Sequence, residues 1–130
     1  YYGTVTMHDI VTGIVRPECA MHDKCYAHIV NGEDLLHVMV FISHCWAENF
    51  DMFVDAICET FRQWPAKPNL WICATALFQT TDPAKIALQV GTGEDPRQAP
   101  FSRALKSAEK LLIVRNDVVD LYSRIWCCWE

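Results

Sequence analysis

The sequence predicts an α/β fold in which helices cover both faces of a mostly parallel sheet. Apolar segments at residues 37–42, 69–74 and 110–115 have the length and the β-branched content of buried strands. The first of them, His-Val-Met-Val-Phe-Ile, is apolar at nearly every position, as expected for a central parallel strand. Stretches with helical spacing lie between the segments, and strands that alternate with helices predict parallel pairing with right-handed crossovers.

The composition is that of an ordinary globular domain. Its 130 residues suffice for one domain with a single core, and the net charge of −5 argues against a nucleic-acid binder, which would carry a basic surface. No apolar run approaches the roughly 20 residues that span a bilayer, and the N-terminus shows no basic region followed by an apolar signal core. We therefore expect no nucleic-acid partner, no membrane partner and a cytoplasmic location.

The cysteines fit a reducing compartment. There are seven, an odd number, and most stand in apolar runs, where a free cysteine behaves as a small hydrophobic residue. They are predicted to be buried free thiols rather than a disulfide framework. Those in apolar runs are Cys45, Cys58, Cys73, Cys127 and Cys128.

Residues 1–34 are expected to form a partly helical extension in front of the main domain at 35–130. Thr6 is placed to cap a short helix that stops at Pro17, because the residue before a proline disfavours helix. A second short helix is expected over residues 22–30, closed by Asn31-Gly32.

Four potential metal ligands recur at every third residue of this extension, namely Cys19, His22, Cys25 and His28. Steps of three turn about 300° on a helix, so the four side chains spread over half its circumference instead of converging. Zinc sites more often join two ligand pairs across a longer connector. The spacing therefore favours coincidence, and no metal is predicted.

The longest helix is expected over residues 48–62. Its apolar side chains fall at helical spacing and form a stripe that should face the sheet. A second helix is expected over 82–90, followed by a glycine-rich loop at 91–96 and a third helix over 101–108 that leads into the last strand. The stripe of the longest helix consists of Phe50, Phe53, Val54, Ile57 and Phe61.

The C-terminal stretch carries the first candidate for chemistry. After the last strand comes a turn with Asp117, and then a Tyr-Ser-Arg-x-Trp-Cys-x-x-Glu segment that resembles the opening of a helix. On a helix Trp126 and Glu130 are four residues apart and share one face. Open α/β sheets bind ligands beyond the carboxyl ends of their strands, which makes Glu130 a candidate catalytic carboxylate.

Three segments together resemble TIR domains. Phe41-Ile42-Ser43-His44 resembles the end of the first TIR strand, and Phe101-Ser102-x-x-Leu105-x-x-Ala108 resembles the helix before the third strand. Tyr122-Ser123-Arg124-x-Trp126-Cys127-x-x-Glu130 is close to the plant-type signature of the catalytic helix. The Ser-His-Cys-Trp sequence after the first strand is also similar to a divergent TIR-like group of single-celled eukaryotes.

The resemblance covers residues 35–130 and implies a flavodoxin-like three-layer sandwich of the TIR type. A TIR domain continues beyond this glutamate through its last strands and helices, so the C-terminal part of the fold is expected to be missing from this chain. Within residues 75–100, the self-association loop of the family is not recognisable.

The resemblance also implies an activity. TIR enzymes cleave the bond between nicotinamide and ribose in NAD, and Glu130 matches the glutamate that performs this cleavage. A carboxylate there would stabilise an oxocarbenium-like transition state or orient the ribose hydroxyls, while Trp126 lines the nicotinamide. NAD is the substrate, no further cofactor is expected, and the assembly that TIR enzymes need implies a homo-oligomer that acts in stress, immune or cell-death signalling.

Other candidate substrate-binding residues follow the first two strands. Ser43 and His44 stand where the first strand ends, so they are expected to contact the rest of the ligand. Trp46, Trp71 and Phe78 are candidates for the walls of the same pocket.

Each candidate also has a structural alternative. Ser43 could cap a turn, His44 could lie on the surface, and a buried tryptophan is commonly a packing residue. Glu130 could be a solvated helix carboxylate. Cys127 and Cys128 have no basic neighbour in sequence and are expected to pack in the core. The alternative function is a non-catalytic TIR module that recruits partner proteins.

Overall fold

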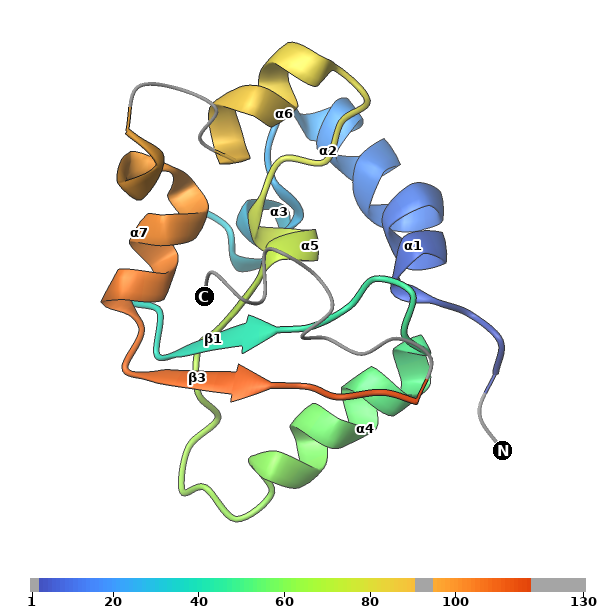
Figure 1. The fold of residues 1–130 in the computed structure, drawn as a ribbon, viewed down its shortest axis with the longest axis vertical. Coiled ribbons are helices and arrows are strands. Elements are labelled where there is room, and N and C mark those ends of the chain that lie inside the picture. The colour runs from blue at the N-terminus through green and yellow to red at the C-terminus, as the bar shows by residue number, and fades with distance from the viewer. Residues whose placement is uncertain (1–2, 91–94, 118–130) are drawn as a thin grey trace.

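The computed structural model describes residues 3–90 and 95–117 (Figure 1). Helices and strands alternate along the chain after a helical lead-in, as the sequence predicts. The elements are α1 (Met7–Ile10), the π-helical turn η1 (Val11–Val15), α2 (Arg16–His22), α3 (Tyr26–Asn31), β1 (Val40–Ser43), α4 (Phe50–Thr60), β2 (Leu70–Ile72), α5 (Cys73–Ala76), α6 (Pro83–Val90), the 3-10 turn η2 (Pro96–Gln98), α7 (Pro100–Ser107) and β3 (Lys110–Ile113).

The described strands form one parallel sheet in the order β2-β1-β3. Phe41, in the central strand, pairs with Trp71 on one side and with Leu111 on the other. β1 is buried throughout, as its apolar sequence predicts. The predicted mixed α/β fold with a parallel sheet is therefore confirmed. In Figure 1, α4 lies below the strands and α7 above them.

The face of the sheet toward α4 carries the larger cluster of buried side chains. Val40 and Ile42 point to this face and pack with Phe53, which is the buried member of the α4 stripe. Asn49 begins α4 by accepting a hydrogen bond from the N–H of Met52 at 3.0 Å. The cluster consists of Met7, Val11, Val40, Ile42, Phe53, Ala74 and Val114.

The predicted stripe of α4 is confirmed at four of its five positions. Phe50, Ile57 and Phe61 are partly buried against the cluster around Phe53. Val54 was wrongly assigned to the buried stripe and is 38% exposed. It lines a groove between α4 and α1.

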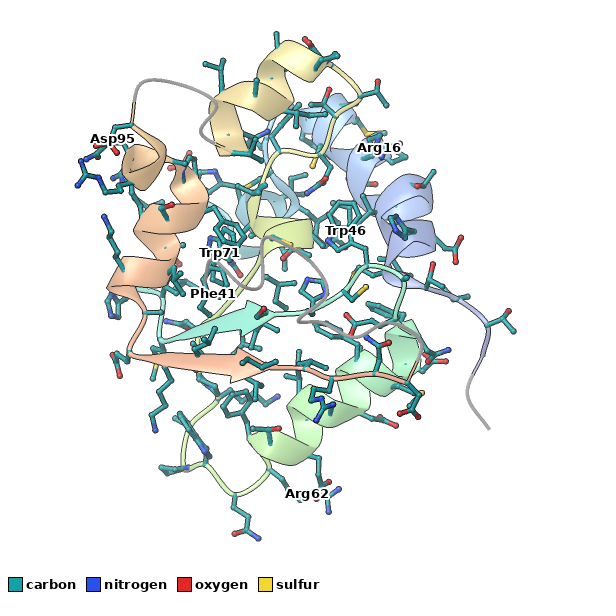
Figure 2. The ribbon with its side chains drawn as sticks, viewed as in Figure 1. Arg16, Phe41, Trp46, Arg62, Trp71 and Asp95 are labelled. Atoms are coloured by element: carbon teal, nitrogen blue, oxygen red, sulfur yellow. The ribbon has the colours of Figure 1, made fainter. Side chains whose placement is uncertain are left out.

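The opposite face holds an aromatic cluster. Phe41 stacks on Trp71 with ring centroids 4.7 Å apart, and Phe101 of α7 meets both rings edge-on at 5.1 and 5.4 Å. Figure 2 shows the stacked pair beside α7. Because neighbouring residues of a strand point to opposite faces, Phe41 and Ser43 share this side of β1.

The N-terminal helices pack into the same core. Thr6 forms the predicted cap: its hydroxyl accepts from the N–H of Asp9, and the Asp9 carboxylate accepts from the N–H of Thr6 at 2.8 Å. Met7 and Val11 then belong to the core cluster below α1. The lead-in is thus joined to the sheet by buried apolar side chains.

The expected stop at Pro17 is wrong, because the helical segment runs on to His22. A π-helical turn precedes Pro17, and the proline occupies the first turn of α2, where a missing N–H is tolerated. The next helix begins at Tyr26 rather than at His22, since Asp23 leaves the helix with a φ of 50°. Its predicted end is confirmed, with Gly32 at a φ of 70°.

The remaining boundaries differ by a few residues. β1 begins at Val40 rather than at His37, and β2 ends at Ile72, where Cys73 opens a one-turn helix. The helices expected over 82–90 and 101–108 are confirmed within one residue. Residues 91–94 of the predicted loop lie outside the described part of the chain. Within the described ranges, no helix has both the length and the apolar character needed to cross a bilayer.

Candidate functional site

Three polar side chains and one indole meet beyond the carboxyl ends of β1 and β2. His44 Nδ1 lies 2.7 Å from Glu48 Oε1, and His44 Nε2 lies 3.6 Å from the sulfur of Cys73. The indole N–H of Trp46 donates to the same sulfur at 3.4 Å. His44 and Glu48 are 5% and 1% exposed, whereas Cys73 is half-buried. We call these four residues the His44 cluster.

The turn after β1 brings Glu48 back to His44. The N–H of Glu48 donates to the carbonyl of Cys45 at 3.1 Å, which closes the turn directly behind the strand. The start of α1 then holds this turn from outside, since the N–H groups of Met7 and His8 donate to the carbonyls of Glu48 and Trp46 at 3.3 and 3.1 Å. Residues of the N-terminal helices therefore help to form the cluster.

Strand register brings Cys73 to the cluster. Ile42 is paired with Ile72, so the residues that follow the two strands emerge side by side at one edge of the sheet. The amide of Gln79 donates to the Cys73 carbonyl at 3.2 Å and fixes the backbone at this point. The ring of His44 also packs on Phe53, with centroids 4.9 Å apart.

The electrostatics of the cluster centre on His44. Burial of the ring lowers its pKa, but hydrogen bonds to Cys73 and Glu48 and the charges of these groups outweigh burial and raise the pKa of His44 from 6.5 to about 9. The ring is therefore an imidazolium at neutral pH, with both N–H groups available to its two partners. The second carboxylate oxygen of Glu48 is buried and has no hydrogen-bond partner among the described residues.

The structure brings together some of the predicted site residues. Ser43 is buried at the end of β1, and its carbonyl accepts from the N–H of Val114 at 2.9 Å. His44 is buried beside it and is not the surface histidine of the structural alternative. Trp46 donates its indole N–H to the sulfur of Cys73, and its ring meets that of His8 edge-on with centroids 5.5 Å apart.

Two other predicted residues have different surroundings. Trp71 lies in the middle of β2 and stacks on Phe41 in the aromatic cluster. Phe78 lies against α6: its backbone exchanges two hydrogen bonds with the side chain of Gln89, at 2.7 and 2.9 Å, and Lys85 lies over its ring. The predicted catalytic Glu130 and the predicted nicotinamide contact Trp126 lie outside the described residues, as do Cys127 and Cys128.

Sequence analysis missed Glu48 and Cys73. Glu48 was assigned to the polar start of the long helix, and Cys73 was counted among buried thiols. The available signal was that Cys73 lies near the carboxyl end of the second apolar segment, just as His44 lies after the first. The prediction of a buried thiol is also wrong for Cys58, which is exposed on α4, whereas Cys45 is buried as predicted.

The spacing of Cys19, His22, Cys25 and His28 does not gather these side chains. Cys19 is fully buried in the core beneath α2, while His22 is exposed and pairs with Glu18. Among the described residues, no group of three or more histidine, cysteine or acidic side chains could hold a metal ion.

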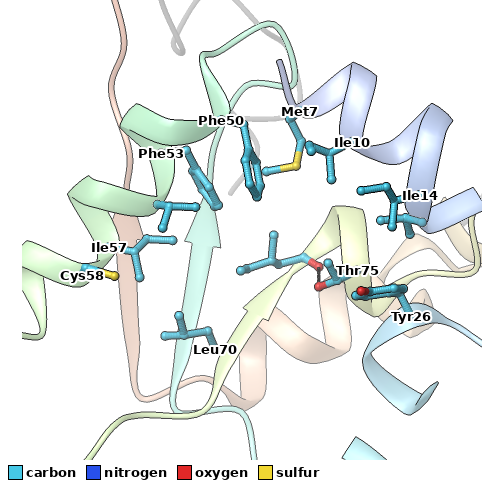
Figure 3. Close-up of a pocket in the computed structure, with 13 residues that line it drawn as sticks. Met7, Ile10, Ile14, Tyr26, Phe50, Phe53, Ile57, Cys58, Leu70 and Thr75 are labelled. Carbon is cyan, nitrogen blue, oxygen red and sulfur yellow. Dashed lines mark hydrogen bonds between the residues drawn. The ribbon is translucent and has the colours of Figure 1, made fainter. Parts of the chain in front are cut away.

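An apolar groove lies on the α4 face, apart from the aromatic cluster. It has a volume of about 380 Å³ and runs between α4 and α1, with Leu70 and Ile72 of β2 as its floor (Figure 3). Exposed Val54 and Cys58 form part of its α4 wall. The groove carries apolar side chains almost throughout and lacks the ionisable groups of the His44 cluster.

Comparison of the chain with protein-family models, with curated proteins and with solved structures finds no match.

Proposed function

We propose that this chain is a TIR-like domain of flavodoxin-like architecture that cleaves the nicotinamide–ribose bond of NAD. Support comes from the terminal Trp126-Cys127-x-x-Glu130 motif together with the arrangement of the described residues. Glu130 would stabilise the oxocarbenium-like transition state, and Trp126 would line the nicotinamide.

One observation carries this proposal. In a doubly wound sheet that begins with the strand order 2-1-3, ligands bind where the order reverses, beyond the carboxyl ends of the first and third strands. The described sheet has this order, and the N–H of Val114 donates to the Ser43 carbonyl there. The chain that leads to the Trp126–Glu130 motif therefore leaves the sheet beside Ser43 and His44.

The described residues have definite roles in this scheme. Ser43 and His44 form the polar end of β1 at the switch point, where the resemblance implies contacts with the rest of the ligand. Trp46, whose ring meets that of His8 on α1 edge-on, would form a wall of the ligand site. Because the cysteines of the described residues are free thiols, we place the protein in the cytoplasm.

The test is NAD turnover by Glu130→Gln beside the unchanged protein. We expect nicotinamide release by the unchanged protein and a loss of at least about a hundredfold in the variant, since a carboxylate that stabilises transition-state charge is worth that much. The control is Glu33→Gln, which removes an exposed carboxylate and should leave turnover unchanged. Turnover should be followed over a range of protein concentrations, because TIR enzymes act as assemblies. Equal activity of the two variants would exclude this role for Glu130.

A second candidate is a non-catalytic TIR module that binds further TIR domains. Large apolar side chains on the surface favour it: Leu35 is 85% exposed and Leu88 of α6 is 80% exposed. Leu88 lies within residues 75–100, where the resemblance would place the self-association loop, although no such loop is recognisable in the sequence. Leu88→Ser should then raise the dissociation constant of the homo-oligomer, measured by analytical ultracentrifugation. If this constant is unchanged in the variant and the unchanged protein does not cleave NAD, both candidate functions are excluded.

A further inference from the structure

The sulfur of Cys73 has two donors directed at it. The Nε2 of His44 and the Nε1 of Trp46, both from the segment that follows β1, lie 3.6 and 3.4 Å from Sγ. A hydrogen-bond donor stabilises a thiolate more than a thiol, and a positively charged ring does so most strongly. Cys73 is also half-buried rather than fully enclosed.

Glu48 completes a series in which Cys73 is the nucleophile, His44 the base and Glu48 the acidic residue that orients the base. Its carboxylate holds the far nitrogen of His44 at 2.7 Å, which fixes the ring with Nε2 toward the sulfur. A thiol, an imidazole and a carboxylate in this order are the arrangement by which cysteine nucleophiles are activated. Burial of both His44 and Glu48 keeps water from weakening the attraction between their charges.

We propose that Cys73 is a reactive thiolate that is covalently modified by hydroperoxides. The proposal concerns thiol chemistry and does not depend on NAD cleavage. The other described cysteines are not set in such a cluster: Cys19 and Cys45 are buried, Cys25 is half-buried, and Cys58 is exposed on α4.

The chemistry balances with the groups present and one hydroperoxide. The thiolate of Cys73 attacks one peroxide oxygen, the S–O bond forms and the O–O bond breaks. The other oxygen leaves as hydroxide (or alkoxide) and takes the Nε2 proton of the His44 imidazolium, which gives water (or an alcohol) and a neutral ring. The sulfur is oxidised by two electrons to a sulfenic acid, the peroxide is reduced by two, and a cellular thiol restores Cys73 through a disulfide.

The first experiment compares two thiols of one protein. Iodoacetamide is added to the unchanged protein at pH 6, and alkylation is followed by mass spectrometry of tryptic peptides. The peptide 63–85 contains Cys73 as its single cysteine, and fragment ions locate Cys58 in its own peptide. Only a fraction of a per cent of an ordinary thiol is ionised at pH 6, so Cys73 should react about tenfold faster than Cys58 even after the lower nucleophilicity of a stabilised thiolate is included.

The pH profile distinguishes activation from simple exposure. The alkylation rate of Cys73 should change less than about threefold between pH 6 and 8, whereas that of an ordinary thiol rises by more than about tenfold over the same range. His44→Gln should remove the difference and make Cys73 follow the profile of Cys58. The matched control His22→Gln, in which an exposed histidine is lost, should leave both profiles unchanged.

The second experiment uses hydrogen peroxide itself, with dimedone to trap the sulfenic acid. The label should appear on Cys73 at least about tenfold faster than on Cys58, and it should fall to the level of Cys58 in Glu48→Gln and in Trp46→Phe, which remove the orienting carboxylate and the indole donor. If the His44→Gln protein does not fold, the pH profile of Cys73 alkylation in the unchanged protein still tests the proposal. Reaction of Cys73 no faster than Cys58 at pH 6, or dimedone label spread evenly over both, would overturn the proposal.

Discussion

Glu48 Oε1 lies 2.7 Å from His44 Nδ1, and both side chains are buried at the end of the central strand. A second glutamate–histidine pair with the same four-residue separation lies on α2, where His22 Nε2 is 3.4 Å from Glu18 Oε2 and both side chains are more than a third exposed. Among the described residues, these two pairs share residue types and separation, and one is buried while the other is exposed. Burial is the difference that decides their contributions, since solvent screens the exposed pair.

The buried pair predicts how stability depends on pH. The folded protein raises the pKa of His44 from 6.5 to about 9, so it keeps the proton to a higher pH than the unfolded chain does. The resulting stabilisation is complete below about pH 6.5 and is lost as the pH rises through about 9. Cys73, as the thiolate proposed above, has already lost a proton that the unfolded chain keeps up to about pH 8.5, so it balances the proton kept by His44 between about pH 6.5 and 8.5. We expect the free energy of unfolding, from denaturant titrations, to stay nearly constant over that range and to fall as the pH rises through about 9.

Two histidine variants test this dependence. His44→Gln should remove the fall above about pH 8.5, whereas His22→Gln should keep the profile of the unchanged protein. An unaltered slope in His44→Gln would assign the pH dependence to another group.

Glu48→Gln should destabilise the protein because it removes the negative charge beside His44. The substitution keeps the side-chain volume and one hydrogen bond to His44, so the loss of charge is the main change. The loss of a charge-assisted hydrogen bond in a buried site corresponds to about 2 kcal/mol. Glu18→Gln should cost less than about 0.5 kcal/mol, as expected for an exposed pair. Both values come from urea unfolding at pH 7, and equal losses in the two variants would contradict the importance of burial.

Val11→Ala tests whether the N-terminal helices belong to the core of the sheet. Val11 is fully buried in the cluster with Val40 and Ile42, so the cavity left by its two methyl groups should cost about 2 kcal/mol. Ile14 is 48% exposed one turn later, and Ile14→Ala should change stability by less than about 1 kcal/mol. A single unfolding transition is expected in both variants. A separate early transition that reports only on residues 7–22 would show that these helices fold independently.

Local patterns predicted the sheet and most of its helices. The apolar sequence of β1, the helical spacing of α4 and the cap at Thr6 each depend on residues that are close in sequence, and each is confirmed. The helix was wrongly predicted to stop at Pro17 because a π-helical turn before the proline changes the hydrogen-bond pattern. The local sequence contains no signal that predicts such a turn.

The His44 cluster could be predicted only in part, for a physical reason. His44 was a candidate because it follows a strand, but its partner Cys73 is 29 residues away in sequence. Their contact depends on the pairing of Ile42 with Ile72, and a slip of that register by one residue would turn Cys73 to the other face. Glu48 was expected only as the start of the longest helix, and carboxylates seldom lie in a core without a partner. The structure supplies that partner through the turn after β1.

The stacked pair of Phe41 and Trp71 allows the role of Trp71 to be measured. If the indole is a packing residue, Phe41→Leu and Trp71→Leu should show a coupling energy of about 1 kcal/mol in a double-mutant cycle, because each substitution removes the same ring contact. Each single variant should also lose about 2 to 3 kcal/mol of stability, since Phe41 is fully buried and Trp71 contacts both it and Phe101. A residue that only lines a ligand pocket would give additive effects on stability and a change in NAD binding instead. Additivity within about 0.3 kcal/mol, measured by urea unfolding of the four proteins, would therefore return Trp71 to the candidate substrate contacts.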